Sequence, residues 1–96
     1  MEREELMRVL RDALPELRQA YGVRTLALFG SYARGEARKS SDVDLLVEFD
    51  RPPGLFRYIE MEQHLSDLLG IKVDLAMRTA LKPAIGRRIL SEAQPI

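Results

Sequence analysis

The sequence contains no cysteine and only one histidine, His64. Without cysteine the chain forms no disulfide, no thiolate metal site and no thiol nucleophile. One histidine argues against a zinc site and against a nucleophile that depends on a histidine base. Carboxylates, hydroxyls and basic side chains therefore remain as the groups that could carry chemistry.

An excess of charge of either sign is also lacking, since 15 Lys and Arg residues balance 15 Asp and Glu residues. No overall positive field holds nucleic acid, so we expect no direct DNA binding. No apolar run approaches the roughly 20 residues that cross a bilayer, and residues 1–5 are too charged for a signal sequence. We therefore expect no membrane association and a cytoplasmic location, which the lack of cysteine fits.

The 96 residues are 46% hydrophobic and 31% charged, which is typical of an ordinary folded domain. No repeat, linker or low-complexity tract divides the chain. We expect a single domain over residues 1–96, with room for one sheet and a few covering helices.

Apolar residues recur at helical spacing in three segments. The first runs from Arg3 to Tyr21, and Gly22 ends it. Pro15 interrupts this pattern, so the segment either kinks there or continues as a second helix. The other two predicted helices span Leu55–Leu69 and about Lys82–Ala93.

The middle helix has one predicted core side, formed by Leu55, Tyr58, Met61 (or Glu62), Leu65 and Leu68. Phe56 and Ile59 fall beside this stripe. We expect them to widen the core contact, the alternative being a surface patch for a partner or a second copy of the chain.

Three apolar runs have the length of strands: Val23–Phe29, Val43–Phe49 and Ile71–Met77. The first is almost unbroken, which predicts a strand covered on both faces. In the other two, odd positions are apolar and acids stand at even positions, so one face belongs to the core. Residues 31–35 fit a short helical turn, and 36–41 fit a polar loop.

The predicted order is therefore helix, strand, short helix, strand, helix, strand, helix. This order indicates an α/β (or α+β) domain, with a small mixed sheet of three to four strands backed by helices.

The second strand begins with two aspartates, Asp42 and Asp44, which point the same way because side chains alternate along a strand. Asp74 has the same parity on the third strand, so all three would emerge on the face opposite the core. Neighbouring strands lie about 4.8 Å apart, close enough for the three carboxylates to converge on a pair of ions. Glu48 shares this face but lies about 13 Å from Asp44, so we exclude it.

The first strand ends in a Gly30-Ser31 turn, whose backbone N–H groups suit a phosphate. Together with the aspartates, this turn indicates a metal-bound triphosphate as substrate. Asp42 and Asp44 would hold Mg²⁺ on the triphosphate, while Asp74 would hold a second ion and help to deprotonate the acceptor hydroxyl. Gly30 would let the backbone approach the phosphates, and Ser31 would donate its hydroxyl to a phosphate oxygen.

Each acidic or hydroxyl residue also has a purely structural interpretation. Asp42 could be a turn residue or cap, and Asp44 or Asp74 a solvent-facing strand residue. Ser31 could cap the short helical turn, a role compatible with phosphate binding.

The basic residues near these motifs have similar alternatives. Arg34 could bind phosphate or form an ion pair with a nearby acid, whereas Arg38 and Lys39 are expected in a solvated loop. Among the basic residues that follow the third strand, Lys82 is the candidate nucleotide contact. His64 is expected on a helix surface or interface.

Gly30-Ser31, followed after ten residues by Asp42-Val43-Asp44 and later by Asp74, resembles the signature of the nucleotidyltransferase superfamily that includes DNA polymerase beta. The fuller string Phe29-Gly30-Ser31-Tyr32-Ala33-Arg34-Gly35 and the closing segment Leu81–Ala93 resemble its smallest branch, the minimal nucleotidyltransferases of the MNT/MntA type. The resemblance spans nearly the whole chain and shows no departure at the Gly-Ser or the three aspartates.

This resemblance implies a nucleotidyltransferase fold, ATP as substrate and Mg²⁺ as cofactor (two ions, with Mn²⁺ as an alternative). It also implies a partner, a helical HEPN-type ribonuclease toxin, on which AMP is transferred to a tyrosine. The protein would then be an antitoxin. Larger relatives carry a second domain that grips the acceptor, and this chain has no residues for one.

Two other functions stay open. The protein could be a non-catalytic antitoxin that masks its partner, or it could transfer a nucleotide to a small molecule or an RNA end. A homodimer formed through one of the helices is also considered. The nucleotide base, the acceptor residue and the number of nucleotides added are left undetermined by the sequence.

Overall fold

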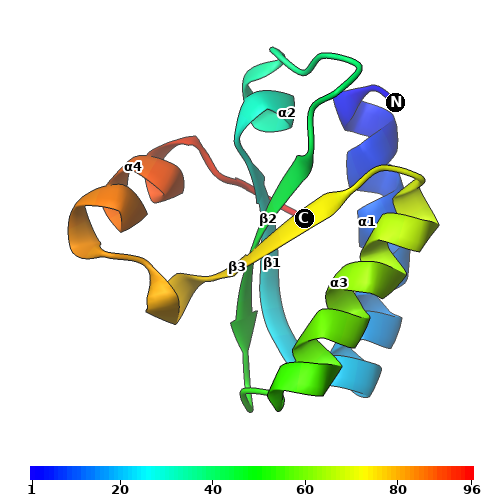
Figure 1. The fold of residues 1–96 in the computed structure, drawn as a ribbon, viewed down its shortest axis with the longest axis vertical. Coiled ribbons are helices and arrows are strands. Elements are labelled where there is room, and N and C mark those ends of the chain that lie inside the picture. The colour runs from blue at the N-terminus through cyan, green and yellow to red at the C-terminus, as the bar shows by residue number, and fades with distance from the viewer.

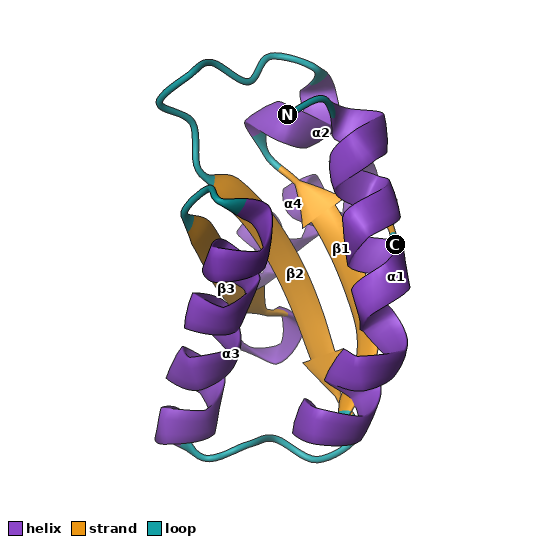
Figure 2. Ribbon diagram, turned by 90° about the vertical axis from the view of Figure 1, so that its right-hand side faces the viewer, coloured by secondary structure: helices purple, strands orange, loops and turns teal.

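The computed structural model describes residues 1–96. Along the chain the elements are α1 (Arg3–Tyr21), β1 (Val23–Phe29), α2 (Ser31–Arg34), β2 (Val43–Phe49), α3 (Leu55–Leu69), β3 (Val73–Met77), the 3₁₀ turn η1 (Arg78–Ala80), α4 (Pro83–Glu92) and β4 (Gln94–Pro95). Figure 1 shows α1 and α3 together on one side of the sheet and α4 on the other. Figure 2, turned by 90°, shows α1 and α3 in front of the strands and α4 behind them.

The four strands form one mixed sheet in the order β3-β2-β1-β4. β2 runs parallel to β3 and antiparallel to β1, and β4 pairs antiparallel with β1. This confirms the predicted mixed α/β class. β4 is not recognisable in the sequence, because two residues are too few to show any alternation.

The register decides which side chains share a face. Leu28 lies opposite Leu45, and Leu26 lies opposite Val47, so these four point into the core beneath α1 and α3. The other face begins with Phe29 opposite Asp44, at the end where β1 runs into α2.

β1 contains an irregularity that the sequence does not reveal. The register shifts between Val23 and Thr25, as in a β-bulge. The extra residue changes the parity, so Val23 is 1% exposed although Leu26 and Leu28 face the same core. Arg24 and Thr25 are exposed. The prediction of a strand covered on both faces is therefore wrong for the first part of β1.

α1 is one continuous helix, which settles the question raised by Pro15. Its four buried leucines are Leu6, Leu10, Leu14 and Leu17. Pro15 lies on the exposed side of the helix, where water is free to satisfy the carbonyl that loses its N–H partner. The helix ends at Gly22, whose positive φ of 74° lets its N–H donate to Arg18 O at 3.0 Å.

α3 has the predicted length but a different buried face. Met61, Leu65 and Leu69 are buried, and the Tyr58 hydroxyl donates to Leu75 O at 2.5 Å. The predicted core positions Leu55 and Leu68 are 70% and 43% exposed, and Phe56 and Ile59 are 86% and 51% exposed. These four core assignments are wrong, because the buried stripe of α3 runs through Met61, Leu65 and Leu69 and leaves these side chains outside it.

The last two segments also differ in detail from the sequence prediction. β3 begins at Val73, two residues later than expected, and α4 spans Pro83–Glu92 with Lys82 as its N-cap. α4 contains no buried residue, so it stands over the sheet without joining the core. None of the helices combines the length and apolar character needed to cross a membrane.

We expect Leu10→Ala to lower the free energy of unfolding by about 2–5 kcal/mol, because it opens a cavity at a fully buried position. Leu68→Ala removes the same atoms from a side of α3 that is 43% exposed, so its cost should stay below about 1 kcal/mol. Urea unfolding of both variants measures the difference, and equal losses would contradict the assignment of the core.

Candidate active site

The site begins where β1 ends, at a close contact between Gly30 and Asp44. Gly30 has a φ of 76° and a ψ of −156°, a conformation that is essentially restricted to glycine. A Cβ placed on Gly30 would lie 2.2 Å from Asp44 Oδ2. Only a residue without a side chain therefore allows this backbone to lie against the carboxylate.

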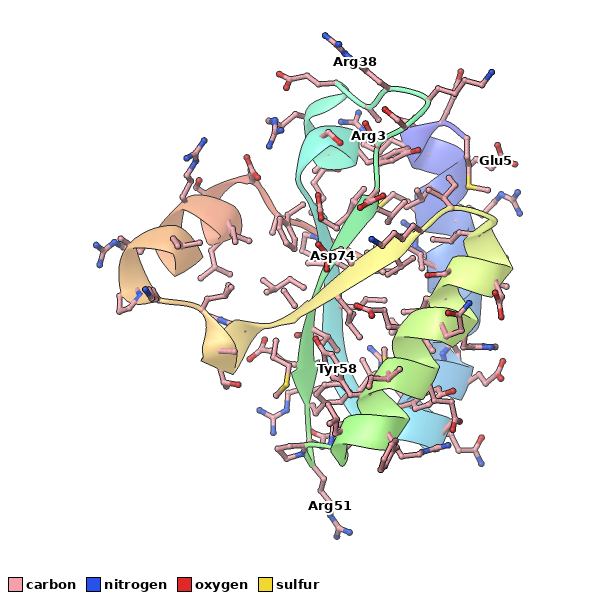
Figure 3. All side chains as sticks on the ribbon, viewed as in Figure 1. Arg3, Glu5, Arg38, Arg51, Tyr58 and Asp74 are labelled. Carbon is pink, nitrogen blue, oxygen red and sulfur yellow. The ribbon has the colours of Figure 1, made fainter.

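The three predicted carboxylates lie on two neighbouring strands and the residue before one of them. Asp44 pairs in register with Asp74 across the parallel β2–β3 ladder, and Figure 3 shows Asp74 where β3 passes over β2. Asp42 directly precedes β2 and lies 3.9 Å from Lys72 Nζ. Asp44 and Asp74 form no ion pair with a basic side chain.

Asp44 is half-buried, and its pKa is raised above the ordinary value of 3.8. Burial is the largest cause, followed by repulsion from Asp74 and then from Asp42. Negative charge is thus concentrated at the three aspartates, and neither Asp44 nor Asp74 has a basic ion-pair partner.

The donor set suits a hard cation, since aspartate oxygens are ligands that Mg²⁺ prefers. No three acidic or histidine side chains converge enough to enclose an ion by themselves. Mg²⁺ usually keeps several waters and binds through one or two carboxylates plus substrate phosphates. The arrangement therefore fits an open site in which a phosphate would complete the coordination.

Arg34 and Glu92 form the other side of the site. Arg34 Nη1 lies 3.2 Å and 3.3 Å from the two carboxylate oxygens of Glu92, and Arg34 Nε lies 3.1 Å from Glu36 Oε2. These hydrogen bonds, first to Glu36 and then to Glu92, raise the pKa of Arg34. The Gly30 N–H also donates to Glu92 Oε1, at 3.3 Å. Of the two roles predicted for Arg34, the structure therefore shows the ion pair with nearby acids.

A pocket of about 380 Å³ lies between these residues and α4, within the size range of small-molecule sites, and Asp44 is the only one of the three aspartates that lines it. It is lined by Phe29, Gly30, Ser31, Arg34 and Asp44 below and by Ile85, Arg88, Ile89 and Glu92 of α4 above. A larger pocket of about 490 Å³ lies beside residues 1–4 and shares only Arg34 with these groups. It contains no aspartate, so the smaller pocket is the candidate active site.

The remaining predicted site residues do not all lie at the pocket. Ser31 lines the pocket, but Gly30 is the N-cap of α2 and no side-chain hydrogen bond caps it, so the capping interpretation of Ser31 is wrong. Lys82 is exposed at the start of α4 and does not line the pocket. Arg38 and Lys39 are exposed in the loop, as expected.

Sequence reasoning missed Glu92 as a site residue and singled out Lys82 rather than Arg88 among the basic residues that follow the third strand. Glu92 is the only acid in α4, whose other charged residues are Arg87 and Arg88. A single acid in a basic helix is a weak sequence signal for a site residue. No local pattern predicts that Glu92 contacts Gly30, which lies 62 positions away in the sequence.

The nucleotidyltransferase domain family has a sequence profile that matches residues 8–96. The chain belongs to this family. The match spans both motifs, the Gly-Ser turn and the Asp-x-Asp pair, so the enzyme class expected from them is confirmed and the protein is a nucleotidyltransferase.

Individual relatives agree with this assignment. The chain is 47% identical over 89 residues to protein adenylyltransferase MntA of Thermococcus cleftensis, covering 93% of this chain and 90% of that protein. A solved structure described as a minimal nucleotidyltransferase matches with a TM-score of 0.84 and 38% identity, covering 100% of this chain and 97% of that one.

A solved complex of a tri-AMPylated Shewanella oneidensis HEPN toxin with an MNT antitoxin contains a chain that matches at a TM-score of 0.62. That alignment covers 97% of this chain and 66% of the other at 20% identity. At this identity it establishes the shared fold alone.

Gly30→Ala should destabilise the protein by at least about 2 kcal/mol, because it combines a strained backbone with displacement of the Asp44 carboxylate. Gly35→Ala is a matched control, since Gly35 has a φ of 72° but no atom within 4 Å of the added Cβ. It should cost about 1 kcal/mol. Thermal or urea unfolding compares them, and equal costs would argue against the contact with Asp44.

Asp44→Asn should raise the free energy of unfolding at pH 7. A carboxyl whose folded pKa is raised costs stability when ionised, and the amide removes that cost. The gain should shrink as pH falls through the raised pKa and vanish below the unfolded value near 3.8, where wild-type Asp44 is protonated in both states. Urea unfolding between pH 7 and about pH 3 measures this, and a gain that persists at low pH contradicts it.

Proposed function

We propose that this protein transfers AMP from ATP to a tyrosine hydroxyl of a HEPN-type toxin and thereby acts as an antitoxin. The observation that carries the proposal is the contact of Gly30 with Asp44, which pairs in register with Asp74 on the neighbouring strand. It puts a backbone that phosphates can approach beside carboxylates that suit Mg²⁺, which are the two requirements of nucleotidyl transfer.

Each residue has a role that follows from its place. Gly30 presents its backbone to the phosphates, and Ser31, which lines the pocket, donates its hydroxyl to a phosphate oxygen. Asp42, Asp44 and Asp74 would hold Mg²⁺ (two ions, or Mn²⁺ in their place), which neutralises negative charge on the triphosphate when bound.

In the proposed reaction the acceptor oxygen attacks the α-phosphorus, and the bond to the pyrophosphate leaving group breaks. The acceptor's proton goes to Asp74, the most exposed of the three aspartates and the one on the open edge of the sheet. Exposure suits this role, because an acceptor on another protein has to reach the base from solvent.

The identity of the acceptor rests on the relatives. The Thermococcus protein is a protein adenylyltransferase and is matched over 90% of its length. The more distant Shewanella complex joins an MNT antitoxin to an AMPylated HEPN toxin. Both favour a protein hydroxyl over a small molecule or an RNA end as the acceptor.

Masking of the partner remains a second candidate, because the chain exposes an apolar surface away from the aspartates. Leu55, Phe56 and Ile59 are exposed on the first turns of α3. Beside them lies a pocket of about 460 Å³, lined almost wholly by apolar residues that include Tyr58 and Leu75. Such a surface suits contact with another protein, and a homodimer through it stays a prediction.

Asp42→Asn and Asp44→Asn should each reduce transfer by about 10²-fold or more, because each removes a charged ligand of the triphosphate–metal complex. Glu48→Gln is the matched control, since Glu48 lies on the same face but pairs with Thr25 and Arg78 instead. Intact mass spectrometry of a HEPN-type toxin, incubated with this protein, Mg²⁺ and each nucleoside triphosphate in turn, measures the transfer.

We expect the toxin to gain one or more AMP units with ATP, and a Tyr→Phe variant of the modified residue to gain none. Full transfer by Asp44→Asn would contradict the proposed site. Neutralisation of the toxin by Asp44→Asn without any mass gain would establish masking in its place.

A further inference from the structure

The last turn of α4 places one carboxylate on the groups that a phosphate would use. Glu92 Oε1 accepts from the Gly30 N–H at 3.3 Å, and the two Glu92 oxygens lie 3.2 Å and 3.3 Å from Arg34 Nη1. The Glu92 side chain is only 26% exposed, although α4 has no buried residue. The carboxylate therefore reaches down into the pocket beside Asp44.

A carboxylate and a phosphate compete for the same donors. Both are anions that accept charge-assisted hydrogen bonds from guanidinium and backbone N–H groups. Each Glu92 oxygen that occupies Arg34 or Gly30 therefore blocks a phosphate oxygen from doing so. Its charge also adds to that of Asp44, so a triphosphate would meet repulsion as long as Glu92 stays in the pocket.

We propose that Glu92 is an intramolecular competitor of the triphosphate, which occupies the Gly30 and Arg34 donors in the nucleotide-free protein and is displaced when the phosphates enter. This inference rests on the proposed function, because it assigns the pocket to a triphosphate. Arg34 then exchanges one anion for another and remains paired throughout. The exchange holds the pocket closed to weakly binding anions and admits a ligand with several phosphate oxygens.

The Glu92 side chain is able to leave the pocket without disturbing the core. α4 contributes nothing to the core, and beyond Glu92 it is tied to the sheet by the two residues of β4 and by Ile96 N–H donating to Leu26 O at 2.9 Å. Withdrawal of the Glu92 side chain therefore breaks its contacts with Gly30 and Arg34 but exposes no buried apolar residue of the helix.

Glu36 offers a matched control for Glu92. It binds the same guanidinium, through Arg34 Nε at 3.1 Å, and its replacement by glutamine removes the same charge. Its side chain is 66% exposed, and it neither contacts Gly30 nor lines the pocket. A general effect of charge would act in both variants, whereas competition for the pocket acts only through Glu92.

The test is a titration with inorganic triphosphate, and separately with ATP, in the presence of Mg²⁺. Calorimetry gives the affinity, and the amide resonance of Gly30 reports contact at the site. Glu92→Gln should bind both ligands about three- to tenfold more tightly than the wild type, the size of effect expected for one partly exposed charged pair. Glu36→Gln should stay within about twofold of the wild type.

Glu92→Ala supplies a readout that needs no ligand. Gly30 N–H should exchange with solvent faster in this variant than in the wild type, because its acceptor is gone. An unchanged melting temperature of the variant, followed by circular dichroism, shows that the fold is intact. Equal or weaker triphosphate binding by Glu92→Gln would overturn the inference and leave Glu92 as a support that holds Arg34 in place.

The two proposals fail separately. If the toxin gains AMP but Glu92→Gln binds triphosphate no more tightly than the wild type, the competition is wrong and the proposed function stands. If Glu92→Gln binds more tightly but no transfer occurs to any acceptor, the competition stands and the proposed function is wrong. If neither inorganic triphosphate nor ATP binds to the wild type or to Glu92→Gln, both proposals are overturned.

Discussion

The contact between the Gly30 backbone and the Asp44 carboxylate is the constraint on which the rest of the site depends. It exists because β1 and β2 pair antiparallel with Phe29 opposite Asp44, so the turn after β1 meets the first acid of β2. The parallel pairing of β2 with β3 then adds Asp74 beside Asp44. A shift of either register by one residue would send these carboxylates into the core.

The site concentrates negative charge that the folded protein does not neutralise. Burial and the neighbouring aspartates raise the pKa of Asp44, and the guanidinium of Arg34, which counteracts this rise, is held by two glutamates. The ionised carboxylate of Asp44 is thus kept at some cost to stability. The core beneath α1 and α3 supplies that stability from the opposite face of the sheet, so packing and chemistry are separated by one layer.

Most of the fold could be predicted because its signals are local. Strand alternation correctly put Asp44 and Asp74 on one face, and helical spacing located α1 and α3. The failures have physical causes that short-range patterns do not contain. The phase of α3 depends on how it lies over β3, which exposes Leu68 and buries Leu69. The bulge in β1 returns Val23 to the core against its parity, and β4 exists only because the chain end meets β1.

The sequence by itself determined the Gly-Ser turn, the Asp-x-Asp pair and the enzyme family, because each depends on residues close together along the chain. Only the tertiary structure decided which side chains of α4 enter the site. Lys82 starts that helix and lies outside the pocket, whereas Glu92 ends it and reaches Gly30 across 62 positions. Helical periodicity shows which residues of α4 share a side, but the packing of the whole domain determines where that side points.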